Sequence, residues 1–444
     1  MDTETETKTP KIALISLGCS KNLVDSEKIL GRLAHGEVTF CQDPETADVL
    51  IVNTCGFVQD AKEESINAIL ELAKLKEGGG PGKLIVTGCL AERYEEELIK
   101  EIPEIDHVVK LENFDKIAEL SGITPHEGAA NGSCNGRDES RIRLTPTHYA
   151  YLKISEGCDN SCSYCAIPEI RGPFVSRPLE DILREAEQLA AGGARELNLI
   201  AQDSTRYGID LYGRQHLHEL LRMLSEISSL RWIRLLYAHP AHFYAGLIGE
   251  IAKNEKVVKY IDLPIQHIND KMLQSMGRQV TRSRVEGLIH RLRGEIPDLY
   301  LRTTVIVGFP GEGEGEFGEL LEFLEETAFE RLGAFTYSRE EDTPAATFKG
   351  HVSEPDKRRR LAEVMTLQQG INFKNNERLV GHSMEVLVDA AQESGEGWLA
   401  RSYRDAPEVD SHVSVRGTGL SPGTFKMVTI TDQEGYNLVA NCVE

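Results

Sequence analysis

The sequence predicts an α/β protein of three domains, and three observations carry this prediction. Residues 11–122 contain three apolar runs, each followed by a helical pattern, which is typical of a parallel sheet with right-handed crossovers. Residues 146–378 contain six further apolar runs, with helical patterns between several of them. Residues 379–444 contain five short strand patterns separated by turn residues, which predict a small antiparallel β-barrel.

Each domain follows from its own runs. KIALISLGC, DVLIVNTCG and KLIVTGCL predict an amino-terminal parallel-sheet α/β domain over 11–122. A stretch rich in Gly, Asn and Ser predicts a linker over 123–145. The central runs are YAYLKIS, ELNLIA, WIRLLYA, YIDLPIQ, LYLRTTVIVGF and RLGAFTYS. Six βα units are too few for a closed eight-stranded barrel and favour a central partial (βα)6 barrel over 146–378.

The last domain follows a predicted helix that begins EPDKRRRLAEVM, where Pro355 suits the first helical turn. Its five strand patterns are SMEVLVDA, GWLARSY, SHVSVRG, FKMVTITD and YNLVANCV. Five strands within about 65 residues predict a carboxyl-terminal β-barrel of the kind that binds oligomers.

Composition restricts the class of protein. The 444 residues include no apolar run long enough for a membrane span, and the opening MDTETETKTP does not match a secretory signal. Nine cysteines, an odd number, favour a reducing compartment, so we expect a cytoplasmic protein. We also expect a monomer. The formal net charge of −22 disfavours binding of nucleic acid through its phosphates.

Three cysteines of the first domain stand where its predicted strands end. They are Cys19, Cys55 and Cys89, so that 36 and then 34 residues separate them, about one βαβ unit each. Parallel strands present their carboxyl ends at one edge of the sheet, where open α/β sheets place ligands. We therefore expect the three cysteines to converge in space.

A second set of three cysteines, Cys158, Cys162 and Cys165, lies in CDNSCSYC directly after the first central strand. Zinc is one interpretation, but a structural zinc site needs a fourth ligand that the neighbouring sequence does not offer. An iron–sulfur cubane held by three thiolates leaves one iron open for another ligand. The flanking Gly157 and Pro168 favour a loop, which can wrap a cluster.

The spacing and place of CDNSCSYC resemble the radical S-adenosylmethionine (SAM) superfamily. This resemblance implies that SAM chelates the open iron and is cleaved to a 5′-deoxyadenosyl radical. Tyr164 resembles the aromatic residue that the superfamily usually has before the last cysteine, and a packing role is the alternative. Gln202 and Asp203, after the second central strand, are further candidates for contacting the cofactor.

Over nearly the whole chain, the domain order resembles the methylthiotransferase family. The resemblance implies that Cys19, Cys55 and Cys89 hold a second 4Fe-4S cluster for sulfur insertion, that the last domain is a TRAM domain, and that an electron donor such as flavodoxin or ferredoxin takes part. An unactivated C–H bond has no acidic proton, so a carbon radical and a nearby sulfur donor suit the reaction.

The family has two main branches. One thiolates an adenine of transfer RNA, and the other modifies the β-carbon of an aspartate in small-subunit ribosomal protein twelve. The segments that resemble the protein-modifying branch are SLGCSKNLVDSE, VNTCGFVQDAKEESI, GCLAERY, SEGCDNSCSYCAIPEIRGPFVSR and LIAQDSTRYG. The transfer-RNA branch is the alternative enzyme, and an RNA-binding protein stabilised by zinc or a cluster is the non-enzymatic alternative.

Charge favours the protein-modifying branch. Residues 380–444 contain ten acidic and four basic residues, a net charge of −6, which suits a basic ribosomal protein better than RNA.

Weaker patterns have structural interpretations. GFPGEGEGEFGE, 308–319, has the glycine spacing of a phosphate loop, but Glu312 and Glu314 would repel phosphate, so we expect a flexible loop at the cofactor site. KRRR at 357–360 suits a solvated helix face. His239 and His267 could line the cavity or be structural. The remaining cysteines are read as ordinary thiols: Cys41, Cys134 and Cys442.

Overall fold

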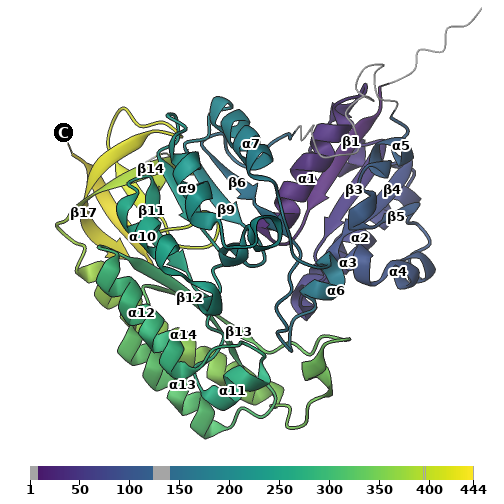
Figure 1. Ribbon diagram of the computed structural model, residues 1–444. Helices are drawn as coiled ribbons and strands as arrows, with labels where there is room; N and C mark the ends of the chain where they lie inside the picture. Colours follow the sequence, from purple (N-terminus) through teal and green to yellow (C-terminus); the bar gives the residue numbers. More distant parts are fainter. Residues whose placement is uncertain (1–8, 124–140, 394, 396, 444) are drawn as a thin grey trace, which may run out of the picture. The chain divides into compact units, whose positions relative to one another are not determined.

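The computed structural model describes residues 9–123, 141–393, 395 and 397–443 (Figure 1). The chain folds into two compact units. The first contains Met1–Leu144 with Ala166–Pro173, and the second contains Thr145–Cys165 with Phe174–Glu444. Cys134 and most of the predicted linker lie outside the described residues.

The first unit is built on a five-stranded parallel sheet in the order β2-β1-β3-β4-β5. The strands are β1 (Lys11–Ser16), β2 (Thr39–Phe40), β3 (Val49–Thr54), β4 (Lys83–Gly88) and β5 (His107–Val109). Its helices are α1 (Ser20–Leu33), α2 (Gln59–Glu77), α3 (Cys89–Arg93), α4 (Glu95–Glu101), α5 (Lys116–Leu120) and α6 (Ile167–Arg171). The three predicted strands are confirmed as β1, β3 and β4. The edge strands β2 and β5 were not predicted, because strands of two or three residues are too short to show an alternation of apolar and polar residues.

The central sheet of the second unit confirms the partial barrel. Six parallel strands run in the order β13-β12-β11-β10-β9-β6. They are β6 (Tyr149–Lys153), β9 (Glu196–Ile200), β10 (Trp232–Leu235), β11 (Val257–Asp262), β12 (Tyr300–Val307) and β13 (Arg331–Thr336), and a two-stranded ribbon pairs β7 (Ser155–Glu156) with β8 (Val175–Ser176). The helices are α7 (Leu179–Ala191), α8 (Ile209–Tyr212), α9 (Leu217–Ser225), α10 (Ala245–Lys253), α11 (Asp270–Ser275), α12 (Arg282–Glu295), α13 (Glu314–Thr327) and α14 (Glu354–Glu377).

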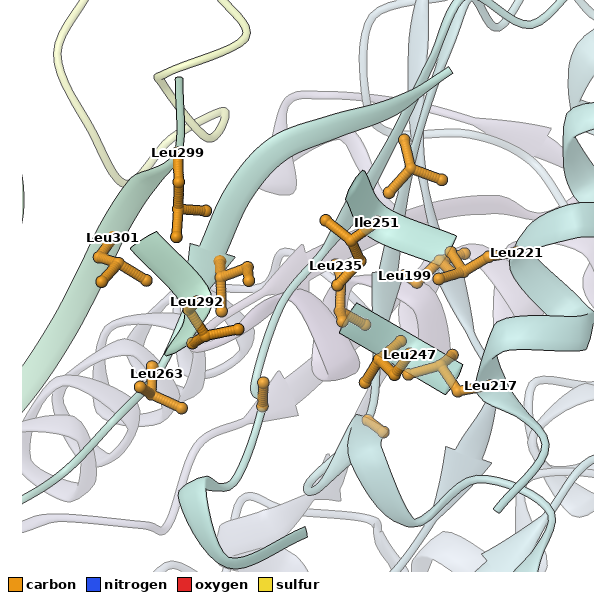
Figure 2. Packing of buried hydrophobic residues seen from close by; sticks show 14 of the residues in the cluster. Leu199, Leu217, Leu221, Leu235, Leu247, Ile251, Leu263, Leu292, Leu299 and Leu301 are labelled. Carbon is orange, nitrogen blue, oxygen red and sulfur yellow. The ribbon is translucent and has the colours of Figure 1, made fainter. Parts of the chain in front are cut away.

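Alternation along these strands divides apolar from polar side chains. Leu199 and Leu235 point into a continuous apolar core shared with Leu217, Leu221 and Leu247 of the covering helices (Figure 2). Other positions of the same six strands carry side chains that are polar yet buried, among them Glu196, Asn198, Arg234, Asp262 and Thr303. Because the side-chain period of a strand is two, neighbouring residues face opposite sides of the sheet. The partial barrel thus has an apolar outer face and a polar inner face.

The last five strands form a closed barrel in the order β14-β15-β16-β18-β17. They are β14 (Ser383–Ala391), β15 (Trp398–Ser402), β16 (Val413–Arg416), β17 (Phe425–Glu434) and β18 (Asn437–Cys442). Four ladders are antiparallel as predicted, whereas β16 and β18 pair in parallel. A ring of five strands cannot alternate direction all the way round, so closure requires a parallel pair. The preceding helix α14 begins with Pro355 in its first turn, as predicted.

Residues 403–410, in the segment between β15 and β16, pack against the polar inner face of the central sheet. Asp405 accepts from Arg331, and Asp410 accepts from the hydroxyl of Tyr260 at 2.6 Å. The carboxylate of Glu408 accepts from the hydroxyl of Tyr149. The acidic residues of this segment thus supply the partners that the buried cations and hydroxyls of the sheet need.

This arrangement corrects the charge argument for the barrel. Five of its ten acidic side chains bond to groups of the second unit that lie outside the barrel: Glu385, Asp389, Asp405, Glu408 and Asp410. Glu396 and Glu444 lie outside the described residues. The net charge of −6 therefore does not measure the charge that the barrel offers to a partner, and it cannot select the basic substrate over RNA.

No helix within the described part of the chain is both long and apolar enough to cross a membrane.

Candidate metal centres

The first cysteine triad lies at the ends of three strands. Cys19 is the N-cap of α1, Cys55 directly follows β3, and Cys89 is the first residue of α3, directly after β4. Because β1, β3 and β4 are parallel neighbours, these ends share one edge of the sheet. The structure therefore brings together the three cysteines that the sequence analysis grouped.

Glycines beside the cysteines allow the strand ends to approach closely. A Cβ on Gly18, which has φ +88°, would lie 2.7 Å from the Cβ and 3.0 Å from the Sγ of Cys55. A Cβ on Gly56 would lie 2.8 Å from the backbone of Leu90. Any side chain at these positions would push the strand ends apart, so the glycines are part of the cradle that holds the thiols.

Asn22 connects the three strand ends from inside the first unit. Its amide Nδ2 donates to the carbonyl oxygens of Leu17 and Thr54, and its Oδ1 lies 3.4 Å from the Sγ of Cys89. The side chain is fully buried. Asn22 thus fixes the β1–α1 turn against the end of β3.

A buried arginine from α6 faces the same thiols. Arg171 Nη1 lies 2.9 Å from a carboxylate oxygen of Asp25, and its Nη2 lies 3.4 Å from the Sγ of Cys89. Burial raises the pKa of Cys89 to about 11, and the Arg171 guanidinium opposes that rise. The cation therefore favours the thiolate, which is the form that binds metal.

The second triad lies on a loop of the second unit, where Gly157 has φ +68°. The amide of Cys165 donates to the carbonyl oxygen of Cys162, which closes a turn between two of the cysteines. The amide of Asn160 donates to the Sγ of Cys158 at 3.4 Å. Burial raises the pKa of Cys158 to about 11, so this thiol is protonated at neutral pH.

Asp203 holds this loop to the end of β9. Its carboxylate accepts from Asn160 Nδ2 at 2.9 Å, from the amide and hydroxyl of Thr205, and lies 2.7 Å from His242 Nδ1. Burial alone would raise the pKa of Asp203, but the hydrogen bonds from His242 and Thr205, with His239 close by, lower it. Both carboxylate oxygens are thus committed to neighbouring side chains, while Gln202 beside it is half-buried.

Tyr164 packs partly buried against an apolar group that includes Met272, Met276 and Phe309. Its hydroxyl lies 3.5 Å from Nη1 of Arg278. Burial raises the pKa of Tyr164 well above its ordinary value, so the phenol stays protonated. The packing role that the sequence analysis allowed is therefore present.

The thiol spacing bears on the zinc and cluster interpretations. Among the described residues, neither triad places its three Sγ atoms within 4.8 Å of one another. One tetrahedral zinc ion with Zn–S bonds of about 2.3 Å would need its thiolates roughly 3.8 Å apart. A cubane binds each thiolate at a different iron corner and takes thiolates that lie further apart.

The structure corrects two minor predictions. Glu312 is buried, accepts from the amide of Gly308 at 3.0 Å and pairs with Arg360 at 2.9 Å, so the 308–314 loop is held rather than free. Lys357 and Arg360 are likewise buried, whereas Arg358 and Arg359 are exposed, so only half of KRRR belongs to a solvated face. Lys357 donates to the carbonyl oxygen of Tyr337.

The structure also assigns places to the remaining histidines and cysteines. His267 is fully buried, and its Nδ1 accepts from the amides of Ile268 and Asn269, which confirms the structural interpretation. His239 accepts from the amide of Ala241 and stacks on His242 with 4.8 Å between ring centroids. Cys41 and Cys442 are free thiols.

Sequence reasoning missed Asn22, Arg171 and Arg278. Asn22 follows Cys19 in CSKN and Arg171 follows the loop in PEIRG, so their proximity to a cysteine motif was the available signal. Arg278 lies 116 residues from the cysteine it contacts, and no local pattern points to it.

Family models match three parts of the chain. Residues 11–110 match the uncharacterized protein family UPF0004, residues 152–324 match the radical SAM superfamily, and residues 380–443 match the TRAM domain. Membership of the radical SAM superfamily implies SAM and one 4Fe-4S cluster.

Solved structures share the fold at low sequence identity. The radical SAM methyltransferase TsrM from Kitasatospora setae has a TM-score of 0.53 at 14% identity, with 76% of this chain and 77% of that chain covered. The cobalamin-dependent SAM radical enzyme OxsB has a TM-score of 0.51 at 13% identity, with 81% of this chain and 56% of that chain covered.

Curated relatives match over nearly the full length. The ribosomal protein uS12 methylthiotransferase RimO of Geobacter sulfurreducens is 49% identical, with 98% of each chain covered. Proteins of the same name from a Thermoanaerobacter species and from Clostridioides difficile are 47% and 46% identical, with 96% and 97% of this chain and 99% and 98% of theirs covered. The chain therefore belongs to the RimO family of radical SAM methylthiotransferases.

Proposed function

We propose that this chain adds a methylthio group to the β-carbon of an aspartate in small-subunit ribosomal protein uS12. The observation that carries the proposal is the pair of cysteine triads in one chain, one at the ends of three parallel strands and one on a loop after β6. Its relatives at 44–49% identity bear the name ribosomal protein uS12 methylthiotransferase, which supports this substrate over transfer RNA.

Two 4Fe-4S clusters fit the donor sets. Cys158, Cys162 and Cys165 would hold one cluster and leave an iron open for SAM, and the strand-end triad, Cys19, Cys55 and Cys89, would hold the second, at which sulfur is supplied. When bound and reduced, the first cluster supplies one electron that splits SAM into methionine and a 5′-deoxyadenosyl radical.

The protein's own residues position these groups. Asp203 and Asn160 fix the loop between the first two of its cysteines. Tyr164 and Gln202 remain our candidates for contacts with SAM. Tyr164 belongs to the cysteine loop, and Gln202 precedes Asp203, which holds that loop through Asn160. Asp203 contributes through Asn160, since its oxygens are already bonded.

The proposal includes the expected setting of the enzyme. Its functional domains are 11–122, 146–378 and 379–444, joined by a linker over 123–145. Electrons come from a donor such as flavodoxin or ferredoxin, and the enzyme acts as a cytoplasmic monomer.

Iron content tests the two-cluster proposal. Anaerobically reconstituted protein should carry about eight irons per chain, and replacement of either whole triad with Ala should remove about half. Cys442→Ala is the matched control, because its thiol belongs to neither triad, and it should keep the full content. Stoichiometric zinc in both sites after anaerobic purification would contradict the proposal.

Product analysis separates the roles of the triads. Cys162→Ala should abolish 5′-deoxyadenosine formation, whereas Cys55→Ala should retain it and lose the methylthiolated product. Mass analysis of uS12 and transfer RNA, each offered with reduced protein, SAM and sulfide, identifies the substrate. Methylthiolated adenosine with an unmodified uS12 aspartate would refute the substrate and leave the radical chemistry intact.

A further inference from the structure

The end of helix α11 forms a seat for the cysteine loop of the second unit. After Met276 the chain turns through Gly277, which has φ +69°, and the amide of Arg278 donates to the carbonyl oxygen of Leu273. A Cβ on Gly277 would lie 2.3 Å from the carbonyl oxygen of Ser161. Only glycine lets the loop and the turn approach this closely.

Ser163 fastens the loop to this seat. Its amide donates to the carbonyl oxygen of Met276 at 3.0 Å, and its hydroxyl donates to that of Ser275 at 2.7 Å. The carbonyl oxygen of Ser163 accepts from the amide of Ala345. The backbone between Cys162 and Cys165 is therefore tied to the residue that precedes Gly277.

The side chain of Arg278 extends from this turn toward Cys162, the middle cysteine of the loop. Its Nη1 lies 3.6 Å from the Sγ of Cys162, and its Nη2 donates to the carbonyl oxygen of Pro264. The residue is only 4% exposed. Its Nε is buried without a hydrogen-bond partner among the described residues.

No carboxylate lies within ion-pair distance of the Arg278 guanidinium among the described residues, and Asp203 acts on its charge from further away. Within the described residues no ion pair joins its guanidinium to an acidic side chain, although other buried arginines, such as Arg234 and Arg331, each have one. A buried charge is stable when it is paired, and a free cation would be costly. As a thiolate, Cys162 would be the negative group in direct contact with the guanidinium, while Asp203 acts on it from further away.

We propose that Arg278 is a positioning residue that pairs with the Cys162 thiolate and raises the reduction potential of the cluster bound by this loop. The inference rests on the proposed function, because it assumes that the loop holds a cluster. Reduction adds one electron from an external donor and makes the cluster more negative. A fixed neighbouring cation and an N–H···S contact stabilise that state, and no proton is transferred.

Redox titration of the full-length reconstituted chain tests the proposal. The signal followed is the electron paramagnetic resonance of the cluster that changes on addition of SAM, so the other cluster does not interfere. At the potential where the parent cluster is half reduced, Arg278→Met should lower the ratio of reduced to oxidised cluster at least threefold. That corresponds to a shift of about 28 mV at 59 mV per tenfold for one electron.

Two further variants separate charge from packing. Arg278→Lys keeps the charge and should stay closer to the parent potential than Arg278→Met. Arg282→Met removes a cation of α12 that pairs with Glu286 four residues along the same helix, and it should leave the potential unchanged. A parental potential in Arg278→Met, or equal shifts in the Met and Lys variants, would overturn the proposal.

Loss of the cluster is also decisive. If both Arg278 variants fail to hold the SAM-responsive cluster, thermal unfolding of the apoproteins is compared with the parent. An unchanged midpoint means that the guanidinium acts at the thiolate and supports the proposal, whereas a lowered midpoint assigns Arg278 to folding and overturns it. A parent chain that holds no cluster would instead refute the proposed function.

Discussion

Glu196 is the central anion of the contact between the partial barrel and the carboxyl-terminal barrel. One carboxylate oxygen lies 2.9 Å from Nε of Arg234, and the other lies 2.8 Å from Nη1 of Arg401. The side chains of Glu196 and Arg234 are fully buried, and that of Arg401 is 5% exposed. Glu196 thus pairs with Arg234 and shares Arg401 with Asp389, which lies 2.8 Å from Nε of Arg401.

We expect Glu196→Gln to destabilise the second unit strongly. The amide preserves the size of the side chain but removes the charge, and its NH₂ group faces a guanidinium that can only donate. Breaking a buried ion pair from one side typically costs about 3–5 kcal/mol. Arg234 loses its ion-pair partner while Arg401 keeps Asp389, so a loss within that range, about 3–5 kcal/mol, is expected.

Glu385→Gln is the matched control. Glu385 also joins the two barrels, through an ion pair of 2.7 Å to Arg231, but Arg231 is 60% exposed. Exposed pairs contribute about 0–1 kcal/mol, so the control should lose no more than that. The two variants differ in burial and share the chemical change.

Tryptophan fluorescence during urea unfolding measures both effects. The chain has two tryptophans, Trp232 and Trp398, and both belong to the second unit. The signal therefore reports the unit that contains the network and no other. Equal losses of unfolding free energy in Glu196→Gln and Glu385→Gln would refute the reasoning from burial.

Two further predictions concern the seat of the loop and a buried histidine. Gly277→Ala should lose the SAM-responsive cluster and at least about 1 kcal/mol of stability, because the φ of +69° at Gly277 suits glycine and an added Cβ would meet Ser161. Gly287 on α12 is the control, because a Cβ there meets nothing within 4 Å, so Gly287→Ala should keep the cluster in the same spectroscopic assay. Burial lowers the pKa of His267 to about 3, so the stability it contributes is complete above its unfolded pKa of about 6.5 and is lost as pH falls toward 3. Between pH 7.5 and 5.5 the parent should therefore lose about 1.4 kcal/mol more in urea unfolding than His267→Gln, and equal losses would contradict the assignment.

The strands and the cysteine motif could be predicted because their signals are local. YAYLKIS, ELNLIA and the other central runs alternate or cluster apolar residues over five to eight positions, which is the length of the strands they form. The positions of Cys19, Cys55 and Cys89 at strand ends implied convergence, since parallel strands end at one edge.

The charge of the barrel could not be predicted in the same way. Net charge counts Asp405 and Asp410 as if both faced solvent, although they bond to Arg331 and Tyr260 across the second unit. Composition contains no information on which side chains are paired. The same limit explains why the whole of KRRR was assigned to a solvated face, although Lys357 and Arg360 are buried.

The sequence by itself determined the order of domains, the parallel strands and the two sets of three thiols, because spacing and periodicity act between residues close in the chain. Only the tertiary structure decided which cations accompany the thiols. Arg171 reaches Cys89 across 82 residues, and Arg278 reaches Cys162 across 116. Contacts at such separation are set by how strands and helices pack, and electrostatic pairing inside a protein depends on distance and burial rather than on position in the chain.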